Sequence, residues 1–230
     1  MEPAANITFD ETRFMELLRD FQRILDAALN SLAGTEPPTA VSHYISWAAL
    51  FISRTSAGYI ILHDAGQIHS SKLLIRPALE TTFAAAAAVK DPKFLYRKAY
   101  SEWLEINKLF AKDTAGKMAA DQELKELDKA FRQDCPQHPV EKKKIKIEET
   151  AQMAGVSAVY QGAYRIYCQF THGALHAVMG DLDEATDRKT AYTMAWCVLM
   201  MLDLLQKNSP AQIPDLTAHK RILKALKRGA

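Results

Sequence analysis

The chain has 230 residues, of which 48% are hydrophobic and 24% charged, and its net charge is +2. This balance is typical of a globular protein that buries a proper core, and its near-neutral charge argues neither for nor against a nucleic-acid partner. With nine glycines and nine prolines, the chain also has too few turn residues for an all-β fold built on many turns.

The cysteine content and the N-terminus indicate the compartment. The three cysteines lie far apart in the sequence and show no spacing typical of a metal site. The N-terminus lacks both a basic start and an apolar run, so we expect no signal peptide. Together these features predict a protein of the reducing cytoplasm.

Two apolar stretches approach the length of a membrane span. Tyr44 to Leu62 is long enough but carries Arg54 and several serines at its centre. Ala191 to Leu205 has only 15 residues and contains Asp203. Because a span needs about 20 largely uncharged residues, both stretches are predicted to be core helices, with no membrane partner. Arg54 is then expected to be buried and to need a partner.

The first half of the chain shows helical spacing of apolar residues throughout. The second predicted helix is apolar around most of its circumference, so we expect it near the centre of a bundle. Helices are predicted at about Asp10 to Leu32, Ala40 to Ala65, His69 to Val89 and Pro92 to Lys112.

The second half begins with a charged excursion at about 113–150, in which lysines cluster and apolar spacing is poor. Three more helices are predicted at about Val156 to Thr171, Ala185 to Gln206 and Leu216 to Lys227, and the last of them, within 216–228, is basic. We therefore predict an all-α fold, a single-domain helical bundle of about seven to nine helices covering 1–230.

One stretch within the helix at about Val156 to Thr171 carries the chemistry. On a helix, the tyrosines of this stretch form one stripe and its polar side chains form a neighbouring stripe. The polar stripe consists of Arg165, Cys168, Gln169 and His172. A histidine moves protons near neutral pH, and an arginine binds phosphate through a fixed fork of donors. The two side chains can therefore hold and cleave an RNA phosphodiester, whose own 2′-hydroxyl is the nucleophile.

This motif resembles the HEPN superfamily (higher eukaryotes and prokaryotes nucleotide-binding domain), in which a histidine follows an arginine four to six residues later. Six residues separate Arg165 from His172. The wider layout, with Arg76-Pro-Ala-Leu-Glu80 on an early helix and Tyr164 to Gly173 on a later one, is similar to an uncharacterised bacterial HEPN-like family. The likeness covers roughly residues 40–205.

The resemblance implies a metal-independent ribonuclease that assembles its site across a homodimer, often with an antitoxin or another defence-system partner. Arg165 and His172 would be catalytic, with RNA as substrate and no cofactor. Gln169, Tyr164 and His176 are the expected substrate contacts. Ile166 departs from active members, in which a polar residue often follows the arginine. The alternative is a non-catalytic HEPN-like dimerising module that binds a partner protein or a nucleotide.

Two further readings concern the same helices. Arg76 and Glu80, at i and i+4, are predicted to form a structural ion pair, and Arg165 could instead pair with a carboxylate such as Glu80. His172 and His176 form a pair that could bind a metal with a third ligand, but no diiron-type motif occurs, so we expect no metal. The aromatic set of this region is either core or a base-stacking platform; it comprises Tyr160, Tyr164, Tyr167, Phe170, Tyr192 and Trp196.

Overall fold

The structure, a computed structural model, describes residues 11–109, 144–171 and 184–228, together with positions 118, 121, 122, 125, 126, 129, 132 and 133. Helices connected by turns make up this part of the chain, which contains no strand, so the prediction of an all-α fold is confirmed. The elements are α1 (Glu11–Ser31), α2 (Ala40–Asp64), α3 (Ile68–Lys72), α4 (Ile75–Lys90), α5 (Phe94–Leu109), α7 (Ile147–Ala154), α8 (Ser157–Val159), η1 (Tyr160–Tyr164), α9 (Arg165–Thr171), α11 (Glu184–Asn208) and α12 (Thr217–Arg228).

The chain divides into two compact units, Met1–Ala85 with Ala158–Ala230, and Ala86–Ser157. Each unit is described by itself below, and the expectation of a single domain stays a prediction.

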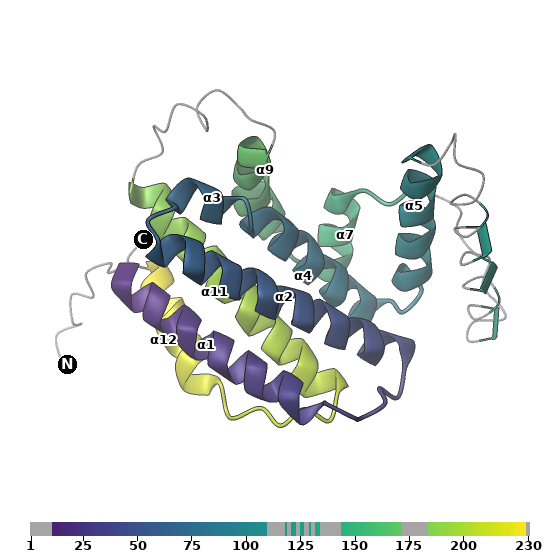
Figure 1. Ribbon diagram of the computed structural model, residues 1–230, viewed down its shortest axis with the longest axis horizontal. Coiled ribbons are helices and arrows are strands. Elements are labelled where there is room, and N and C mark those ends of the chain that lie inside the picture. Colours follow the sequence, from purple (N-terminus) through teal and green to yellow (C-terminus); the bar gives the residue numbers. More distant parts are fainter. Residues whose placement is uncertain are drawn as a thin grey trace. The chain divides into compact units, whose positions relative to one another are not determined.

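Three long helices form the core of the first unit. α1, α2 and α11 lie side by side and contact one another, and α12 contacts α11 (Figure 1). The apolar stripe predicted for α1 is buried, from Phe14 through Phe21 to Leu25. Most of α11 is buried as well, and its buried apolar side chains are Ala191, Met194, Ala195, Cys197, Val198, Leu199, Met201, Leu202, Leu204 and Leu205. α11 is therefore the central helix.

The prediction that α2 lies at the centre of the bundle is wrong for one of its faces. Trp47 is 61% exposed, Phe51 43% and Ile61 68%, and these residues follow one another along one side of the helix. Arg54 lies on the same side and is exposed, so it needs no buried partner. The opposite face, with Ile45 and Ile52, packs into the core.

Buried polar side chains fix α1 against α2. Gln22 Nε2 donates to Ser53 Oγ at 3.1 Å and to Asp26 Oδ1 at 2.9 Å, and Ser53 Oγ donates to Asp26 at 2.6 Å. The hydroxyl of Ser56 also donates to Gln22 Oε1. Because a buried polar group costs free energy unless it is paired, this network favours one register of the two helices.

The helix predicted at about His69 to Val89 is interrupted, and α3 and α4 meet at Leu73 and Leu74. α4 begins at Ile75, so Pro77 lies in its first turn, where its missing N–H breaks no helical hydrogen bond.

The basic C-terminal helix is present as α12. Leu223 is buried at 4% exposure, and Lys220 Nζ lies 2.7 Å from Asp203 Oδ1 of α11. The ring of His219 lies 5.5 Å from that of Phe21. The helix therefore docks through apolar contacts and one ion pair.

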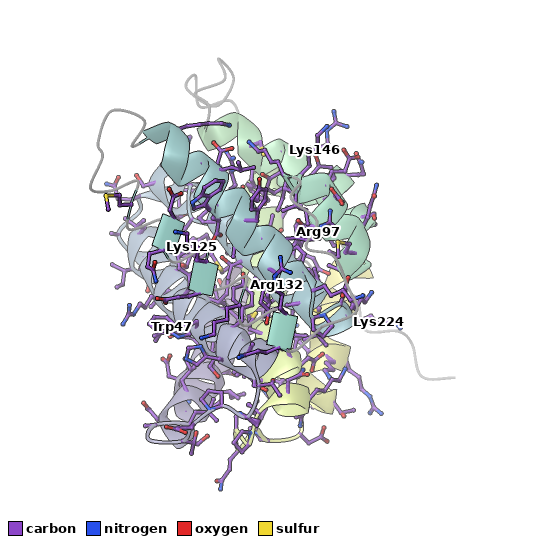
Figure 2. All side chains as sticks on the ribbon, turned by 90° about the vertical axis from the view of Figure 1, so that its right-hand side faces the viewer. Trp47, Arg97, Lys125, Arg132, Lys146 and Lys224 are labelled. Atoms are coloured by element: carbon purple, nitrogen blue, oxygen red, sulfur yellow. The ribbon has the colours of Figure 1, made fainter. Side chains whose placement is uncertain are left out.

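The second unit contains α5 and α7. Arg97 of α5, labelled in Figure 2, is 2.5 Å from Glu149 of α7, and its Nη1 lies 3.8 Å from Met153 Sδ. α7 begins at Ile147, inside the charged excursion predicted at about 113–150, and it buries Thr150. Most of that excursion lies outside the described residues.

In the described part of the chain, α2 is the helix long and apolar enough to cross a membrane by length and composition. Of its most apolar stretch, 44% is buried inside the protein, and core helices of soluble proteins pass the same test of length and composition. The finding is weak evidence for a span, and the expectation of no membrane partner stays a prediction.

The central position of α11 predicts a matched difference between two leucines. Leu202 is fully buried in α11, whereas Leu73, between α3 and α4, is 45% exposed. We expect Leu202→Ala to lower the free energy of unfolding by about 2–5 kcal/mol and Leu73→Ala by less than about 0.5 kcal/mol. Urea denaturation at low protein concentration measures both, and equal losses would contradict the assignment of α11 to the centre.

Candidate functional site

The predicted central helix is present, with a wider turn in its middle. α8, η1 and α9 follow one another without a break from Ser157 to Thr171, and η1 is a π-helix. The backbone N–H of Arg165 donates to the carbonyl oxygen of Tyr160, five residues earlier. Such a turn adds one residue to the helical repeat, so side chains after it point in directions that an ideal α-helical register does not predict.

Tyr164 connects this turn to α4. Its hydroxyl donates to Glu80 Oε1 at 2.6 Å, and Arg76 Nε donates to the same oxygen at 2.9 Å. The Arg76 guanidinium carbon also lies 5.9 Å from the centre of the Tyr164 ring. Arg76 and Glu80 therefore form an ion pair, and Tyr164 is its third member.

Two further aromatic rings, those of Tyr160 and Phe83, pack against Tyr164. The Tyr160 ring stacks on that of Tyr164 at 5.2 Å, with 19° between the planes, and the Phe83 ring lies 6.1 Å from Tyr164. Tyr164 is 4% exposed. Its hydroxyl donates a hydrogen bond to Glu80. The expected contact between Tyr164 and a substrate stays a prediction.

The cluster shifts the ionisation of two of its members. Burial raises the pKa of the Tyr164 phenol, and the hydrogen bond to Glu80 raises it further. The hydrogen bond to Glu80 likewise raises the pKa of Arg76, against the opposing effect of its burial. Arg76 is therefore charged and Tyr164 neutral over the physiological range.

Arg165 points away from this cluster. Its side chain is exposed, and its Nη1 donates to the neutral amide oxygen of Gln161 at 3.2 Å. Within the described residues no carboxylate forms an ion pair with Arg165, and Glu80 is instead bonded to Arg76 and Tyr164. The guanidinium of Arg165 is therefore accessible to an anion.

The remaining predicted site residues are only partly described. Gln169 belongs to α9, but its side chain lies outside the described part of the chain. His172 and His176 lie outside the described residues altogether, as do Asp181 and Asp183, the acidic residues that follow them. Their roles stay predictions. Within the described residues no three His, Cys, Asp or Glu side chains gather as a metal site would require.

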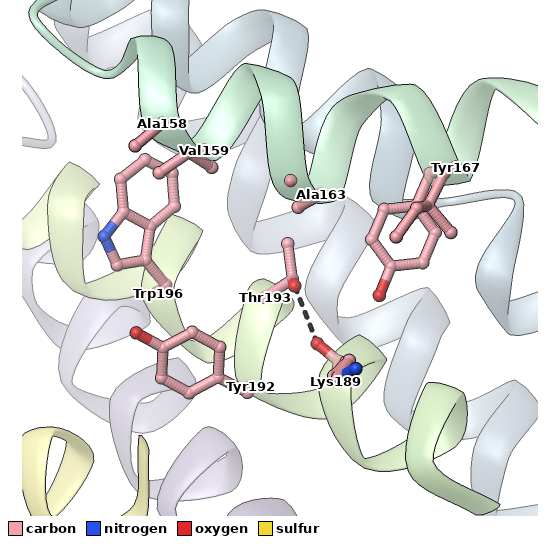
Figure 3. Close-up of a pocket in the computed structure, with 10 residues that line it drawn as sticks. Ala158, Val159, Ala163, Tyr167, Lys189, Tyr192, Thr193 and Trp196 are labelled. Carbon is pink, nitrogen blue, oxygen red and sulfur yellow. Dashed lines mark hydrogen bonds between the residues drawn. The ribbon is translucent and has the colours of Figure 1, made fainter. Parts of the chain in front are cut away.

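A groove beside Arg165 was not predicted from the sequence. It holds about 500 Å³ and lies between the segment α8–η1–α9 and α11 (Figure 3). Three small residues, Ala158, Gly162 and Ala163, belong to one wall, and Tyr192 and Trp196 belong to the other. The spacing of the two aromatics, i and i+4 on one helix face, was the available signal, but the opposing wall depends on tertiary packing.

Comparison with protein families gives one match, over residues 43–190, to the Family of unknown function (DUF5677). The match spans more than half of the chain. The chain belongs to this family. No curated protein and no solved structure matches the chain. The HEPN affiliation expected from the Arg165–His172 motif stays a prediction.

The region shared with the DUF5677 family begins within α2 and ends within α11. It includes the Arg76–Glu80–Tyr164 cluster, Arg165 and the π-helical turn. α1 and α12 lie outside it, as does Trp196. The cluster and the exposed arginine are therefore within the family region.

The raised pKa of Tyr164 predicts a loss of stability at alkaline pH. A tyrosine in the unfolded chain ionises near pH 10, and Tyr164 in the folded chain ionises above that value. The stability contributed by Tyr164 is therefore fully present below about pH 10 and is lost as the pH rises further. Tyr164→Phe should lower the free energy of unfolding by about 1–2 kcal/mol at pH 8, and this difference from wild type should shrink above about pH 10.

Tyr160→Phe is the matched control, because it removes a hydroxyl from the ring that stacks on Tyr164. Denaturant unfolding at a series of pH values measures all three proteins. A difference for Tyr164→Phe that stays constant with pH would show that the phenol is not the group that titrates.

Proposed function

We propose that this chain is a metal-independent endoribonuclease in which Arg165 and His172 act on the RNA phosphodiester. The observation that supports the proposal is the accessible guanidinium of Arg165, which contacts a neutral amide and pairs with no carboxylate in the described part of the chain. The family match includes both residues but carries no activity with it. The HEPN resemblance supplies the expected reaction.

The reaction follows from the chemistry of RNA. The 2′-oxygen attacks phosphorus, the bond from phosphorus to the 5′-oxygen breaks, and a 2′,3′-cyclic phosphate forms. The proton of the 2′-hydroxyl goes to one histidine, and the leaving 5′-oxygen receives a proton from another. In a homodimer the two histidines would be His172 of each copy. Arg165 stabilises the charge that develops on the phosphate oxygens.

The proposal extends to partners and compartment. Such an enzyme would act in the cytoplasm as a toxin or antiphage effector, held inactive by an antitoxin or another defence-system partner. These assignments rest on the HEPN resemblance and on the cysteine content described above.

Substitution of Arg165 and His172 tests the proposal. His172→Ala should slow cleavage of single-stranded RNA by about 10²–10⁴-fold, and Arg165→Ala by about 10²–10³-fold. Because Arg165 is exposed, its substitution should change the free energy of unfolding by less than about 0.5 kcal/mol. Arg13→Ala, which removes another exposed arginine, is the matched control and should cleave RNA like wild type.

All variants are purified identically, so that a contaminating ribonuclease would give the same rate in each. Cleavage by His172→Ala or Arg165→Ala at the rate of Arg13→Ala would refute the proposal.

A second candidate is a non-catalytic dimerising module, and the exposed face of α2 favours it. Trp47, Phe51 and Ile61 form an apolar stripe, with Arg54 and Gly58 between the last two. Apolar stripes on single helices are typical of helix–helix interfaces. In this candidate the partner is a second copy of the chain.

The order of residues along the stripe fits a second copy. Two α2 helices that run antiparallel about a point midway between Arg54 and Gly58 would place Phe51 of each against Ile61 of the other. Each Arg54 would lie near Gly58 of the other copy, beside Leu74, whose Cδ1 lies 3.3 Å from the position of a Cβ added at Gly58. The stripe is thus complementary to itself, as a two-fold interface requires.

A charge placed in the stripe tests this interface. Phe51→Glu and Ile61→Glu should each convert a wild-type dimer into a monomer in light scattering after size-exclusion chromatography, because a carboxylate loses its hydration there. Ile222→Glu, at an apolar position of α12 that is 49% exposed, is the matched control and should leave the dimer intact. A monomeric wild type, or a dimer that survives both changes, would exclude the α2 interface.

A further inference from the structure

The groove between α8–η1–α9 and α11 is widest where part of its near wall carries only small residues. Ala158, Gly162 and Ala163 line that wall, within and beside the π-helical turn. A Cβ atom added at Gly162 would meet nothing within 4 Å. The groove is therefore a hollow between helices, and its volume of about 500 Å³ lies within the range of small-ligand sites.

The far wall presents two flat rings. Tyr192 and Trp196 project from successive turns of α11 into the groove, and both are partly exposed (Figure 3). Aromatic side chains that keep a face open to solvent can stack with another ring. The rings favour a planar, largely apolar group as the occupant.

The hydroxyls of Thr193 and Tyr167 at the groove are bonded within the protein. Thr193 Oγ1 donates to the carbonyl oxygen of Lys189 at 2.6 Å, and the hydroxyl of the buried Tyr167 lies 3.2 Å from Thr190 Oγ1. Stacking and shape, rather than a set of free polar groups, would therefore bind the occupant. Such binding tolerates any base, since every base has two flat faces.

The charges at the groove favour an anionic ligand. Lys189 lines the groove and is exposed, and none of the described residues that line it is acidic. Ile166 lines it as well, at 41% exposure, and Arg165 immediately precedes Ile166 on the helix. Gln161, which Arg165 contacts, likewise immediately precedes Gly162. The accessible guanidinium thus belongs to the residue next to Ile166, on the neighbouring face of the same helix.

From these observations we infer that the groove holds one unpaired base of an RNA strand, stacked on Trp196 and Tyr192, while a phosphate beside that base lies on Arg165. The inference rests on the proposed function and names its substrate class as single-stranded RNA. Duplex RNA is excluded, because its bases are stacked on one another and cannot enter the groove.

The fluorescence of Trp196 can report whether a base occupies the groove. The chain has three tryptophans, so Trp47→Phe with Trp103→Phe leaves Trp196 as the single fluorophore. A short single-stranded RNA with 2′-O-methyl riboses is the probe, because it lacks the attacking hydroxyl and cannot be cleaved. We expect this RNA to quench Trp196 fluorescence in a saturable way, and the duplex of the same sequence to leave it unchanged.

Substitutions at Gly162 provide a matched pair in this background. Gly162→Leu extends a side chain into the groove and should weaken binding of the single strand about 5- to 100-fold, the range expected for one base–aromatic stack. Gly162→Ala adds only a Cβ, which meets no protein atom within 4 Å, and should weaken binding much less than Gly162→Leu. Arg165→Ala should weaken binding but leave the quenching at saturation unchanged, since the base still reaches Trp196.

The results separate the two proposals. Cleavage that depends on Arg165, without quenching of Trp196 or with no effect of Gly162→Leu, would overturn the groove and leave the ribonuclease standing. Quenching that Gly162→Leu weakens, without any cleavage, would support the groove and refute the ribonuclease. Absence of both binding and cleavage would overturn both proposals, and equal quenching by duplex RNA would overturn the groove.

Discussion

The shared carboxylate oxygen of Glu80 is the contact on which the described site depends. It accepts hydrogen bonds from Arg76 at 2.9 Å and from Tyr164 at 2.6 Å, and so it joins α4 to the π-helical turn. Because Tyr164 is held inward, the two residues that follow it point elsewhere. Arg165 is exposed, and Ile166 lines the groove. The Arg76–Glu80 ion pair and the Tyr164 hydroxyl thus hold the backbone from which Arg165 reaches solvent and Ile166 lines the groove.

α11 serves the core and the groove at once. Met194, Ala195 and Val198 are buried in the core, while Tyr192 and Trp196 are partly exposed and face the groove. A helix can do both because successive side chains are rotated by about 100° around its axis, so they point to different sides. The volume of the groove therefore depends on how closely α11 approaches η1, and the small residues of η1 leave that space unfilled.

Periodicity was sufficient to predict the helices but not their neighbours. The stripe of α1 and the apolar length of α11 indicated buried helices, and both are buried. The prediction for α2 was wrong because apolar residues around a helix do not show how many other helices pack against it. Trp47 and Ile61 of this helix are exposed. Arg76 and Glu80 could be paired from their i, i+4 spacing, since that contact is local.

The presence of the groove could not be predicted in this way. The separation of Arg165 from the tyrosine stripe could, since Tyr164 and Tyr167 are buried and Arg165 is exposed. The groove depends on the packing of two segments that are some thirty residues apart in the sequence, and no local pattern encodes their separation. The groove arises from tertiary structure, which explains why the aromatic set was left between core and stacking surface. Tyr164 and Tyr167 prove to be core, and Tyr192 and Trp196 face the groove.

The chemistry of the RNA ends tests the central claim most directly, because it reports which oxygen attacks the phosphorus. Purified protein is incubated with single-stranded RNA in the presence of a chelator, and the products are analysed by mass spectrometry. Attack by the 2′-hydroxyl predicts 2′,3′-cyclic phosphate on one fragment and a 5′-hydroxyl on the other. Intact RNA, or fragments that carry 3′-hydroxyl and 5′-phosphate ends, would contradict the account.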